Sequence, residues 1–251
     1  MKKIALLLVL ACFGLSVRAQ RYIDYRQTTV YVGAAVPRGQ LADYVSGGVN
    51  FGVKEIIPVK KHLSLMVSAD VFHNNVSSGA HEITGFTPDK GYTYKGTSSI
   101  TDVPLFAHLY LGFHADRHNN LRLWMEGAGG VNARFIGKEY WHLNRTVPYS
   151  IEGVNADIHE QCDIVSTFKP TLSLAYQWGL GVTLFRRYSV GWVWYNLGKR
   201  TVKGHNEISN SLYSLDDGNP VSISRTPDVP TTFDYGRLRS RYRAIRFGLT
   251  F

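Results

Sequence analysis

The sequence predicts an all-β protein, an eight-stranded antiparallel transmembrane β-barrel with short periplasmic turns and long extracellular loops. Three observations lead to this prediction. Segments of about ten residues alternate apolar with small or polar side chains, the connections alternate between short and long, and the last strand ends on Phe251. A period of two is typical of a strand whose two faces meet different surroundings, and no helical spacing is sustained after the N-terminal segment.

The first nineteen residues have the pattern of a secretory signal peptide. Two lysines precede an apolar run over residues 4–15, and Val17-Arg18-Ala19 has the small-residue spacing of a cleavage site. About 12 apolar residues are too few to cross roughly 30 Å of hydrocarbon as a helix. Lipid attachment at Cys12 is an alternative that the short apolar run disfavours. We expect a signal peptide over residues 1–19, one barrel domain over residues 20–251, and export to the Gram-negative outer membrane.

The composition of the chain without residues 1–19 argues against several classes of function. Only Cys162 remains, so no intramolecular disulfide can form. Loss of Lys2, Lys3 and Arg18 leaves 25 basic against 19 acidic residues, a net charge of +6 without long basic runs. Nucleic acid is therefore not an expected partner. No later stretch is long and apolar enough for a spanning helix, so a membrane form requires a closed sheet.

Eight segments carry the alternation, and the second loses its pattern at Glu55, where we expect a bulge. The segments are 27–37, 44–59, 62–72, 101–113, 121–135, 171–184, 188–197 and 242–251. On one parity the side chains are apolar, and these are predicted to face lipid: Leu63, Leu65, Val67, Leu105, Leu109, Leu172, Leu174, Leu180, Trp192, Phe247, Leu249 and Phe251.

The connections after the first one alternate between short and long. The short ones lie near residues 60–61, 114–120 and 185–187, and the long ones cover residues 73–100, 136–170 and 198–241. Outer-membrane barrels have short periplasmic turns and long extracellular loops. An even strand number returns both termini to the periplasmic side, where Phe251 would pair with the first strand and leave no edge in lipid.

A family resemblance rests on VPLFAHLYLGF at 103–113, GAGGVNARF at 127–135 and RYSVGWVWYNLGKR at 187–200. These segments resemble the small outer membrane protein beta-barrel domain families abundant in Bacteroidetes, which are similar to the OmpA and OmpX barrels and, in size, to PorT-like barrels. The resemblance covers residues 27–251 except the long loops. It implies a fold and a location but no reaction. The terminal Phe251 also resembles the insertion signal that the outer-membrane barrel-assembly machinery recognises.

The opposite parity carries charged side chains, which we expect to form a polar network inside the barrel. Its predicted members are Lys54, Asp70, His108, Arg122, Glu126, Arg134 and Arg246. Acids among several bases in a narrow interior should form hydrogen-bonded ion pairs, because an unpaired buried charge costs several kcal/mol. A narrow ion path is the alternative, which the small bore of eight strands disfavours.

No catalytic, cofactor or metal site is predicted. Histidines occur in or beside the long loops with many serines, but no spacing of nucleophile, base and acid stands out. These histidines are His73, His81, His142, His159 and His205. The pair His114 and His118 has a spacing that suits a metal only on a helix, whereas a turn is expected here.

Aromatic residues of the long loops are the predicted interaction residues: Tyr92, Tyr94, Tyr140, Trp141 and Tyr213. Residues 91–96 and 219–224 are expected to continue the barrel walls as hairpins whose edges can pair with partner strands. The predicted function is that of a structural or interaction protein at the cell surface, in contact with outer-membrane lipid and lipopolysaccharide, and not an open pore or an enzyme. Alternatives are a component of a secretion or assembly system, a lipid A-modifying enzyme, and a soluble barrel that binds a small apolar ligand.

Overall fold

The structure, a computed structural model, describes residues 27–60, 62–76, 92–94, 98–115, 120–151, 154–216, 219–226 and 231–251. The expected signal peptide, Cys12, His81 and His118 lie outside these residues. The elements are β1 (Gln27–Arg38), the 3₁₀ helix η1 (Gly39–Asp43), β2 (Gly48–Pro58), β3 (Leu63–Asn75), β4 (Tyr92–Tyr94), β5 (Ser99–His114), β6 (Leu121–Ile136), β7 (Glu139–Ile151), β8 (Val154–Phe168), β9 (Thr171–Leu184), β10 (Tyr188–Asp216), β11 (Asn219–Thr226) and β12 (Thr231–Thr250). In the described part, no helix is long and apolar enough to cross a membrane.

Eight strands close into a ring, which confirms the predicted fold class. Their order is β12-β1-β2-β3-β5-β6-β9-β10, and β10 pairs again with β12. Each pair is antiparallel. The ring closes between the first strand and the end of the chain: the Phe251 amide donates to the Thr28 carbonyl over 2.9 Å. Closure satisfies the backbone groups that an open edge would expose.

The two faces of the barrel wall differ along each strand. On β3, Leu65 and Val67 are exposed, whereas Ser64, Met66 and Asp70 are buried inside. A period of two places successive side chains on opposite faces, so the alternation in the sequence becomes an apolar outside and a mainly polar and aromatic inside.

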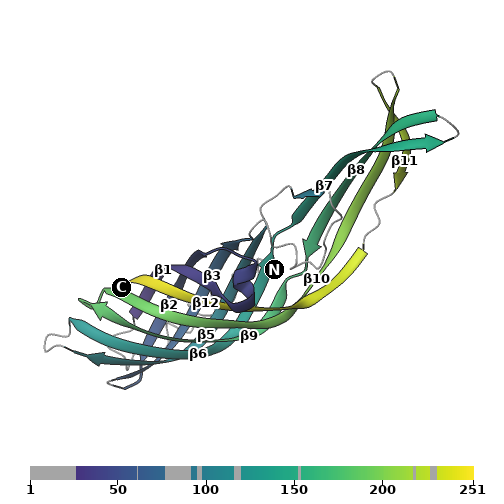
Figure 1. Ribbon diagram of the computed structural model, residues 1–251. Helices are drawn as coiled ribbons and strands as arrows, with labels where there is room; N and C mark the ends of the chain where they lie inside the picture. Colours follow the sequence, from purple (N-terminus) through teal and green to yellow (C-terminus); the bar gives the residue numbers. More distant parts are fainter. Residues whose placement is uncertain are drawn as a thin grey trace.

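The connections lie at the two ends of the barrel as predicted (Figure 1). The last residues of β2, β5 and β9 lie at the end of the barrel that holds Phe251, which we call the turn end, and the strands that enter the arm leave from the opposite end, the mouth. The turn after β9 is tight, because Phe185 and Arg186 both have positive φ. Two successive left-handed residues match the twist of a short hairpin.

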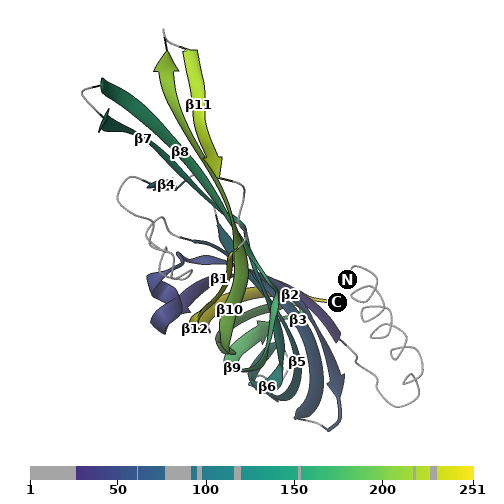
Figure 2. The same ribbon diagram turned by 90° about the vertical axis from the view of Figure 1, so that its right-hand side faces the viewer.

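The long connections form a second structure, which we call the arm. It consists of β4, β7, β8, β11, residues 201–216 of β10 and residues 231–238 of β12. Its sheet order is β4-β7-β8-β10, and β10 also pairs with β11 and with the start of β12. Figures 1 and 2 show the arm as a twisted sheet that leans away from one side of the barrel mouth.

Three sequence-based expectations about these elements are wrong. The segments 136–170 and 198–241 are predicted as loops but are largely strands. The first contains β7 and β8, and β10 runs without a break from the barrel into the second. β2 begins at Gly48 instead of residue 44. Glu55 is not at a bulge, since its pairing with Val67 continues the register on both sides. The irregularity lies in β10 instead, where the register with β12 shifts around Gly198 at φ +87°.

Candidate functional site

An ion cluster centred on Arg246 occupies the barrel interior. One terminal nitrogen of Arg246 donates to Asp70 over 2.8 Å, the other lies 3.5 Å from Glu126, and its Nε donates to Asn50 over 3.2 Å. Tyr31 donates to the same Asp70 carboxylate over 2.6 Å. Each of these charged groups is buried, so each needs its partners to offset the loss of water.

Aromatic rings enclose the Arg246 guanidinium. Its central carbon lies 4.3 Å from the centroid of Tyr31 and 4.8 Å from that of Tyr195. Gly52 makes room for Tyr31, because a Cβ there would lie 2.6 Å from the tyrosine hydroxyl oxygen. The charge is thus held between π-faces as well as carboxylates.

A second cation reaches the cluster from the side of the turn end. Lys54 Nζ lies 3.5 Å from Glu126 and 4.6 Å from the ring centroid of Trp124. Trp124 fits because Gly181 and Gly191 lack side chains, since a Cβ at Gly181 would lie 2.4 Å and one at Gly191 2.5 Å from its ring. Three further residues form an apolar layer with Trp124 at this level of the barrel: Ile56, Met66 and Tyr110.

His108 lies beside the ion cluster, between Ser68 and Gln177. Its Nε2 is 2.8 Å from the Ser68 hydroxyl and its Nδ1 is 3.1 Å from the Gln177 amide nitrogen. Two other contacts fix the orientation of the Gln177 side-chain amide: the amide oxygen accepts from Arg246, and the amide nitrogen donates to Glu126. Nδ1 is therefore the acceptor, and we assign the proton of the ring to Nε2.

The tautomer of His108 that carries its proton on Nε2 sets the direction of the hydrogen bonds around Ser68. His108 donates to Ser68, and Ser68 in turn donates to Asp70 over 3.3 Å. A nucleophilic serine needs a histidine that accepts its proton. The arrangement around Ser68 is therefore a structural hydrogen-bond chain and does not activate the hydroxyl.

A second ion pair lies nearer the mouth. Arg134 Nε donates to Asp102 over 2.9 Å, and Asn132 donates to the same carboxylate oxygen over 2.7 Å. The other oxygen accepts from the Tyr242 hydroxyl over 3.1 Å, and Arg134 also donates to Ser240. Both charged groups are buried and satisfied by several partners.

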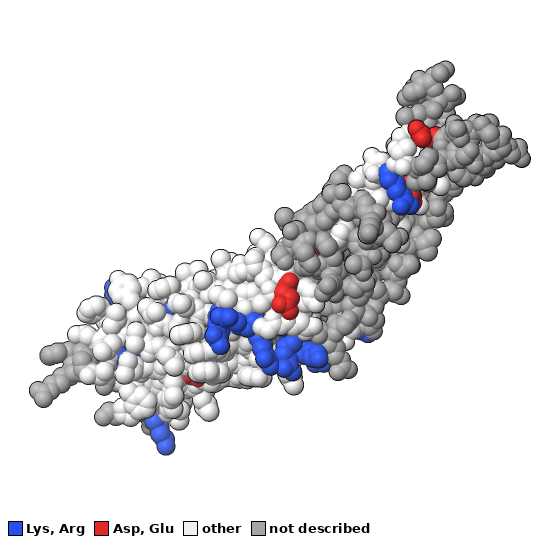
Figure 3. Space-filling model, in the orientation of Figure 1, with Lys and Arg blue, Asp and Glu red and all other residues white. Residues whose placement is uncertain are grey.

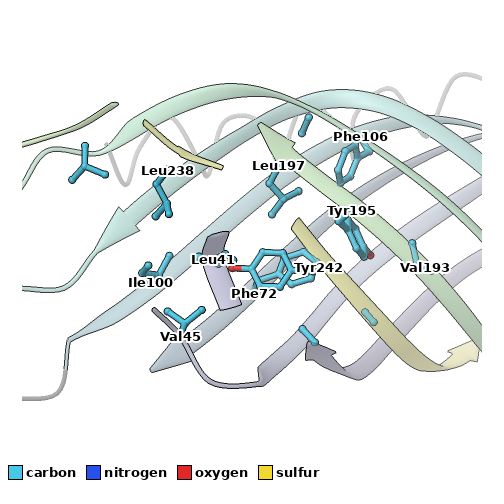
Figure 4. Packing of buried hydrophobic residues seen from close by; sticks show 14 of the residues in the cluster. Leu41, Val45, Phe72, Ile100, Phe106, Val193, Tyr195, Leu197, Leu238 and Tyr242 are labelled. Atoms are coloured by element: carbon cyan, nitrogen blue, oxygen red, sulfur yellow. The ribbon is translucent and has the colours of Figure 1, made fainter. Parts of the chain in front are cut away.

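An apolar cluster fills the interior from the level of Phe106 up to the mouth (Figure 4). η1 inserts Leu41, which is fully buried, next to the rings of Phe72 and Tyr242. The Phe72 ring stacks on Tyr242 at 4.8 Å and meets Tyr195 edge-on at 4.7 Å. Further members of the cluster are Val45, Ile100, Leu197, Val202 and Leu238. Packed hydrocarbon thus lies between the Arg246 cluster and the mouth.

The structure places the seven predicted members of the polar network on the inner face. Six of them are buried: Lys54, Asp70, His108, Glu126, Arg134 and Arg246. Arg122 is half-buried near the turn end, with its guanidinium 5.0 Å from the Tyr110 ring centroid. Arg134 belongs to the separate ion pair near the mouth. Sequence reasoning missed Asn50, Asp102 and Gln177, although their inward parity in predicted strands is a signal that could have found them.

The outer wall carries the side chains predicted to face lipid. Eleven of the twelve are exposed: Leu65, Val67, Leu105, Leu109, Leu172, Leu174, Leu180, Trp192, Phe247, Leu249 and Phe251. Leu63 is half-buried. Trp178 also lies outside, where it stacks on Trp194 at 3.8 Å, and Trp194 stacks on Trp192 at 5.1 Å. The exposed band is therefore apolar with an aromatic portion on β9 and β10.

The arm has one covered face near its base. Trp141 is predicted as an exposed interaction residue, and this prediction is wrong, because the side chain is only 3% exposed and packs with Leu143, Cys162 and Ile164. On β7, Trp141 points to the covered face of the sheet. A prediction that treats this segment as a loop assigns no faces and therefore does not identify the side chain as buried. Tyr140, on the other parity, is exposed. The other predicted interaction residues lie on strands, with side chains outside the described part: Tyr92, Tyr94 and Tyr213.

Charged pairs occur along β7 and β8. His142 Nδ1 lies 2.6 Å from Asp163, and Arg145 Nε lies 2.6 Å from Glu160. His159 contacts Thr146 at 3.0 Å. These two arm histidines are thus engaged with strand neighbours, and no group of three metal-ligating side chains occurs among the residues described.

Glu139 is the unusual ionisable group at the base of the arm. It is only 3% exposed, and it pairs across the sheet with Ser166, which is also buried. Burial raises the pKa of the Glu139 carboxyl to about 7, and the nearby Trp141 has a smaller, opposite effect. A carboxyl with this pKa changes charge near neutral pH.

No protein-family model matches the sequence, and a search of curated proteins finds no match. Three solved structures are similar in chain path. Ail, the attachment invasion locus protein of Yersinia pestis, solved with the heparin analogue sucrose octasulfate, has a TM-score of 0.38 and 11% identity, over 90% of this chain and 99% of that chain. OprG of Pseudomonas aeruginosa has a TM-score of 0.44 and 11% identity, over 90% and 96%. A major outer membrane protein of Thermus thermophilus has a TM-score of 0.39 and 11% identity, over 90% and 100%.

Similarities at this level do not assign the chain to a family or an activity. The strand pairing of the chain itself defines the fold: a ring of eight antiparallel strands with a filled interior, an apolar outer wall and a protruding sheet on one side.

Proposed function

We propose that the protein is an integral outer-membrane β-barrel that acts as a structural or interaction protein through its arm, and that its barrel is not an open pore. The observation that carries this proposal is the apolar band around the outside of the ring. Leu174, Leu172 and Phe247 keep 76%, 69% and 58% of their surface exposed. Soluble monomers rarely expose contiguous apolar patches above a few hundred Å².

The length of the band agrees with a bilayer. On β9 the outward apolar side chains run from Leu172 to Val182, and on β5 from Val103 to Phe113. A tilted strand needs about 9–11 residues to cross the hydrocarbon. Lipid supplies the surroundings that make this exposure favourable, and ring closure satisfies the backbone. The outer membrane is the bilayer in which such barrels occur.

The filled interior supports the proposal that the barrel does not conduct. Arg246, Asp70 and Glu126 are paired with each other and with neighbours, and aromatic and apolar layers lie on both sides of them along the barrel axis. A path for ions would require these packed layers to separate.

The arm is the element proposed to bind a partner. The part of β10 beyond Arg200 extends roughly 50 Å at about 3.3 Å per residue, so the sheet would stand clear of the membrane. In the described part of the chain, β4 covers only Trp141–Leu143 of the β7 edge. The remainder of that edge offers backbone groups for pairing with a partner strand, which is a common mode of peptide recognition. A secretion or assembly component would use the same edge.

Heat-modifiable migration on SDS gels tests the membrane barrel. The detergent-extracted protein should migrate differently before and after boiling, and the folded form should require detergent to stay dispersed. A monomer that is folded and stable in buffer without detergent would contradict the proposal.

Crosslinking in native outer membranes tests the arm. A variant in which residues 138–169 are replaced by a short Gly-Asn turn removes β7 and β8 and leaves β6 and β9 intact. It should keep heat-modifiable migration and lose the crosslinked proteins that the wild type captures. The control is Lys60→Gln, an exposed residue at the turn end, which should capture the same proteins as the wild type. Identical capture with and without β7 and β8 would refute the proposed interaction through this edge of the arm.

A further inference from the structure

A basic cleft opens on the outer wall where the barrel meets the arm. It has a volume of about 220 Å³ and is lined by Arg38, Gly39, Gln40, Lys199, Arg239 and Arg241. Figure 3 shows Lys and Arg side chains gathered on this part of the surface, between the largely uncharged barrel wall and the arm. The four charged residues that line it are exposed.

Three adjacent strands build the cleft through their register. Arg241 of β12 lies opposite Arg38 of β1, and Arg239 of β12 lies opposite Lys199 of β10. The register of β10 and β12 shifts just before Lys199, where Gly198 has φ +87°. After this shift, Lys199 meets an outward-facing arginine instead of a buried residue. The bulge is therefore the local feature that completes the cluster.

Among the described residues, no carboxylate balances the positive charge of the cleft. Like charges directly opposite each other on a sheet destabilise it. Among the described residues, none of the four cations that line the cleft forms an ion pair with a carboxylate. Four cations around one cleft thus create a positive potential that an external anion can offset.

The apolar outer wall of the barrel next to the cleft indicates what kind of anion the cleft suits. On β12 the outward side chains change from the arginines at 239, 241 and 243 to Ile245 and Phe247 within one strand. Next to them on β10 and β9 lies the stack of Trp194, Trp192 and Trp178. A ligand that fills both surfaces has an anionic head at the cleft and hydrocarbon along the wall.

We propose that this cleft binds the phosphate groups of a phosphorylated glycolipid in the outer leaflet, with the acyl chains lying along β12 and β10. The inference rests on the proposed membrane location. Arginine forms paired hydrogen bonds with phosphate, and the cleft supplies three arginines and one lysine. A soluble phosphate would use only the charged half of this surface, because it has nothing to place against the apolar and aromatic wall.

Native mass spectrometry of the protein released from detergent tests the inference. The probes are bisphosphorylated lipid A, the same lipid after enzymatic removal of both phosphates, and inorganic phosphate. The variant Arg239→Gln/Arg241→Gln removes two of the cleft cations. The matched control Arg186→Gln/Arg187→Gln removes the same charge from the exposed turn at the turn end. All of these side chains are exposed, so folding should be preserved, and heat-modifiable migration checks it.

The wild type and the control should retain bisphosphorylated lipid A roughly tenfold or more above the cleft variant, given the attraction expected per cation near a membrane surface. The dephosphorylated lipid should bind all three proteins alike. Equal retention by cleft variant and control would overturn the inference, as would inorganic phosphate that displaces the lipid at equal concentration. If heat-modifiable migration is absent, the membrane proposal fails. If it is present and lipid selectivity is absent, only this inference fails.

Discussion

Arg246 organises much of the barrel interior. It contacts Asp70, Glu126, Asn50 and Gln177, which come from four different strands, and two aromatic rings cover its planar group. Several charge-assisted hydrogen bonds in one dry site favour a single arrangement of those strands. The residue therefore contributes to the register of the barrel as well as to its charge balance.

Replacing Arg246 with Met should lower the free energy of unfolding by about 3–5 kcal/mol, because Asp70 keeps its charge without a cationic partner. Denaturant unfolding in lipid vesicles measures the loss. Arg243→Met, which removes an exposed guanidinium three residues earlier, should change stability by about 0.5 kcal/mol or less. Adding Asp70→Asn to Arg246→Met should recover part of the loss. Equal effects of the two arginine substitutions would contradict the ion-cluster assignment.

Each barrel strand, as an element, separates two environments. β3 places Leu65 and Val67 outside and Ser64, Ser68 and Asp70 inside, without an interruption of its pairing with β2. Register is strongly specified in such a strand, since a slip by one residue would exchange every side chain between the outer wall and the interior.

Replacing Leu65 with Arg should destabilise the barrel by about 2–4 kcal/mol, because the charge would enter hydrocarbon. Ser64→Ala, one residue away on the inner face, should be nearly neutral, because the smaller side chain fits the same buried site. Unfolding in vesicles of defined thickness compares the two. A loss of equal size at both positions would show that the assignment of faces is wrong.

The base of the arm should respond to pH through Glu139. Its folded pKa of about 7 lies above the value of an exposed glutamate, so the folded state binds more protons than the unfolded state between those values. The stability of the arm should fall as pH rises from about 4.5 to about 7 and then level off. Amide hydrogen exchange of β7 and β8, corrected for the intrinsic rate at each pH, measures this.

Glu139→Gln is the variant that isolates the effect. It keeps the size of the side chain and removes the titration of residue 139, so the fall in protection of β7 and β8 across this window should be smaller than in the wild type. Glu160→Gln, which removes the carboxylate paired with Arg145, serves as the comparison and should leave the pH response in place. A wild-type arm with pH-independent protection would contradict the role of Glu139.

At the scale of the complete molecule, closure of an eight-stranded ring explains why the interior is filled with side chains. An eight-stranded ring is narrow enough for side chains to fill it, and here polar, aromatic and apolar layers succeed each other along the axis. The arm then extends the walls on one side only, through β10 and the strands next to it (Figure 2).

Planar-bilayer recordings check this description of the interior. The purified protein should carry no steady current at moderate voltage, because the packed side chains of the Arg246 cluster and of the layers around it fill the interior of the barrel formed by the described residues. Boiled and unboiled samples of the same preparation provide the comparison. A steady current that scales with salt concentration and disappears on boiling would contradict the proposal that the barrel does not conduct.

Much of the barrel can be predicted from the sequence, whereas the arm cannot. The alternation from Leu63 to Val71 predicts a two-faced strand whatever its neighbours are, and inward parity places Lys54 and Arg246 in one interior. The alternation in residues 139–168 is broken by charged and polar side chains on both faces, so this segment is predicted as a loop. Trp141 is consequently assigned to an exposed site, although it packs on the covered face of the arm.

The class of fold and the two faces of each strand can be read from the chain alone, because a period of two and the contrast between apolar and polar side chains are local properties. Which charges meet depends on the folded barrel. Arg246 reaches Asp70 and Glu126, and the cations from β1, β10 and β12 gather at one cleft, because register brings together residues that are far apart in the chain. Register in turn follows from the closure of the complete ring, which no single segment encodes.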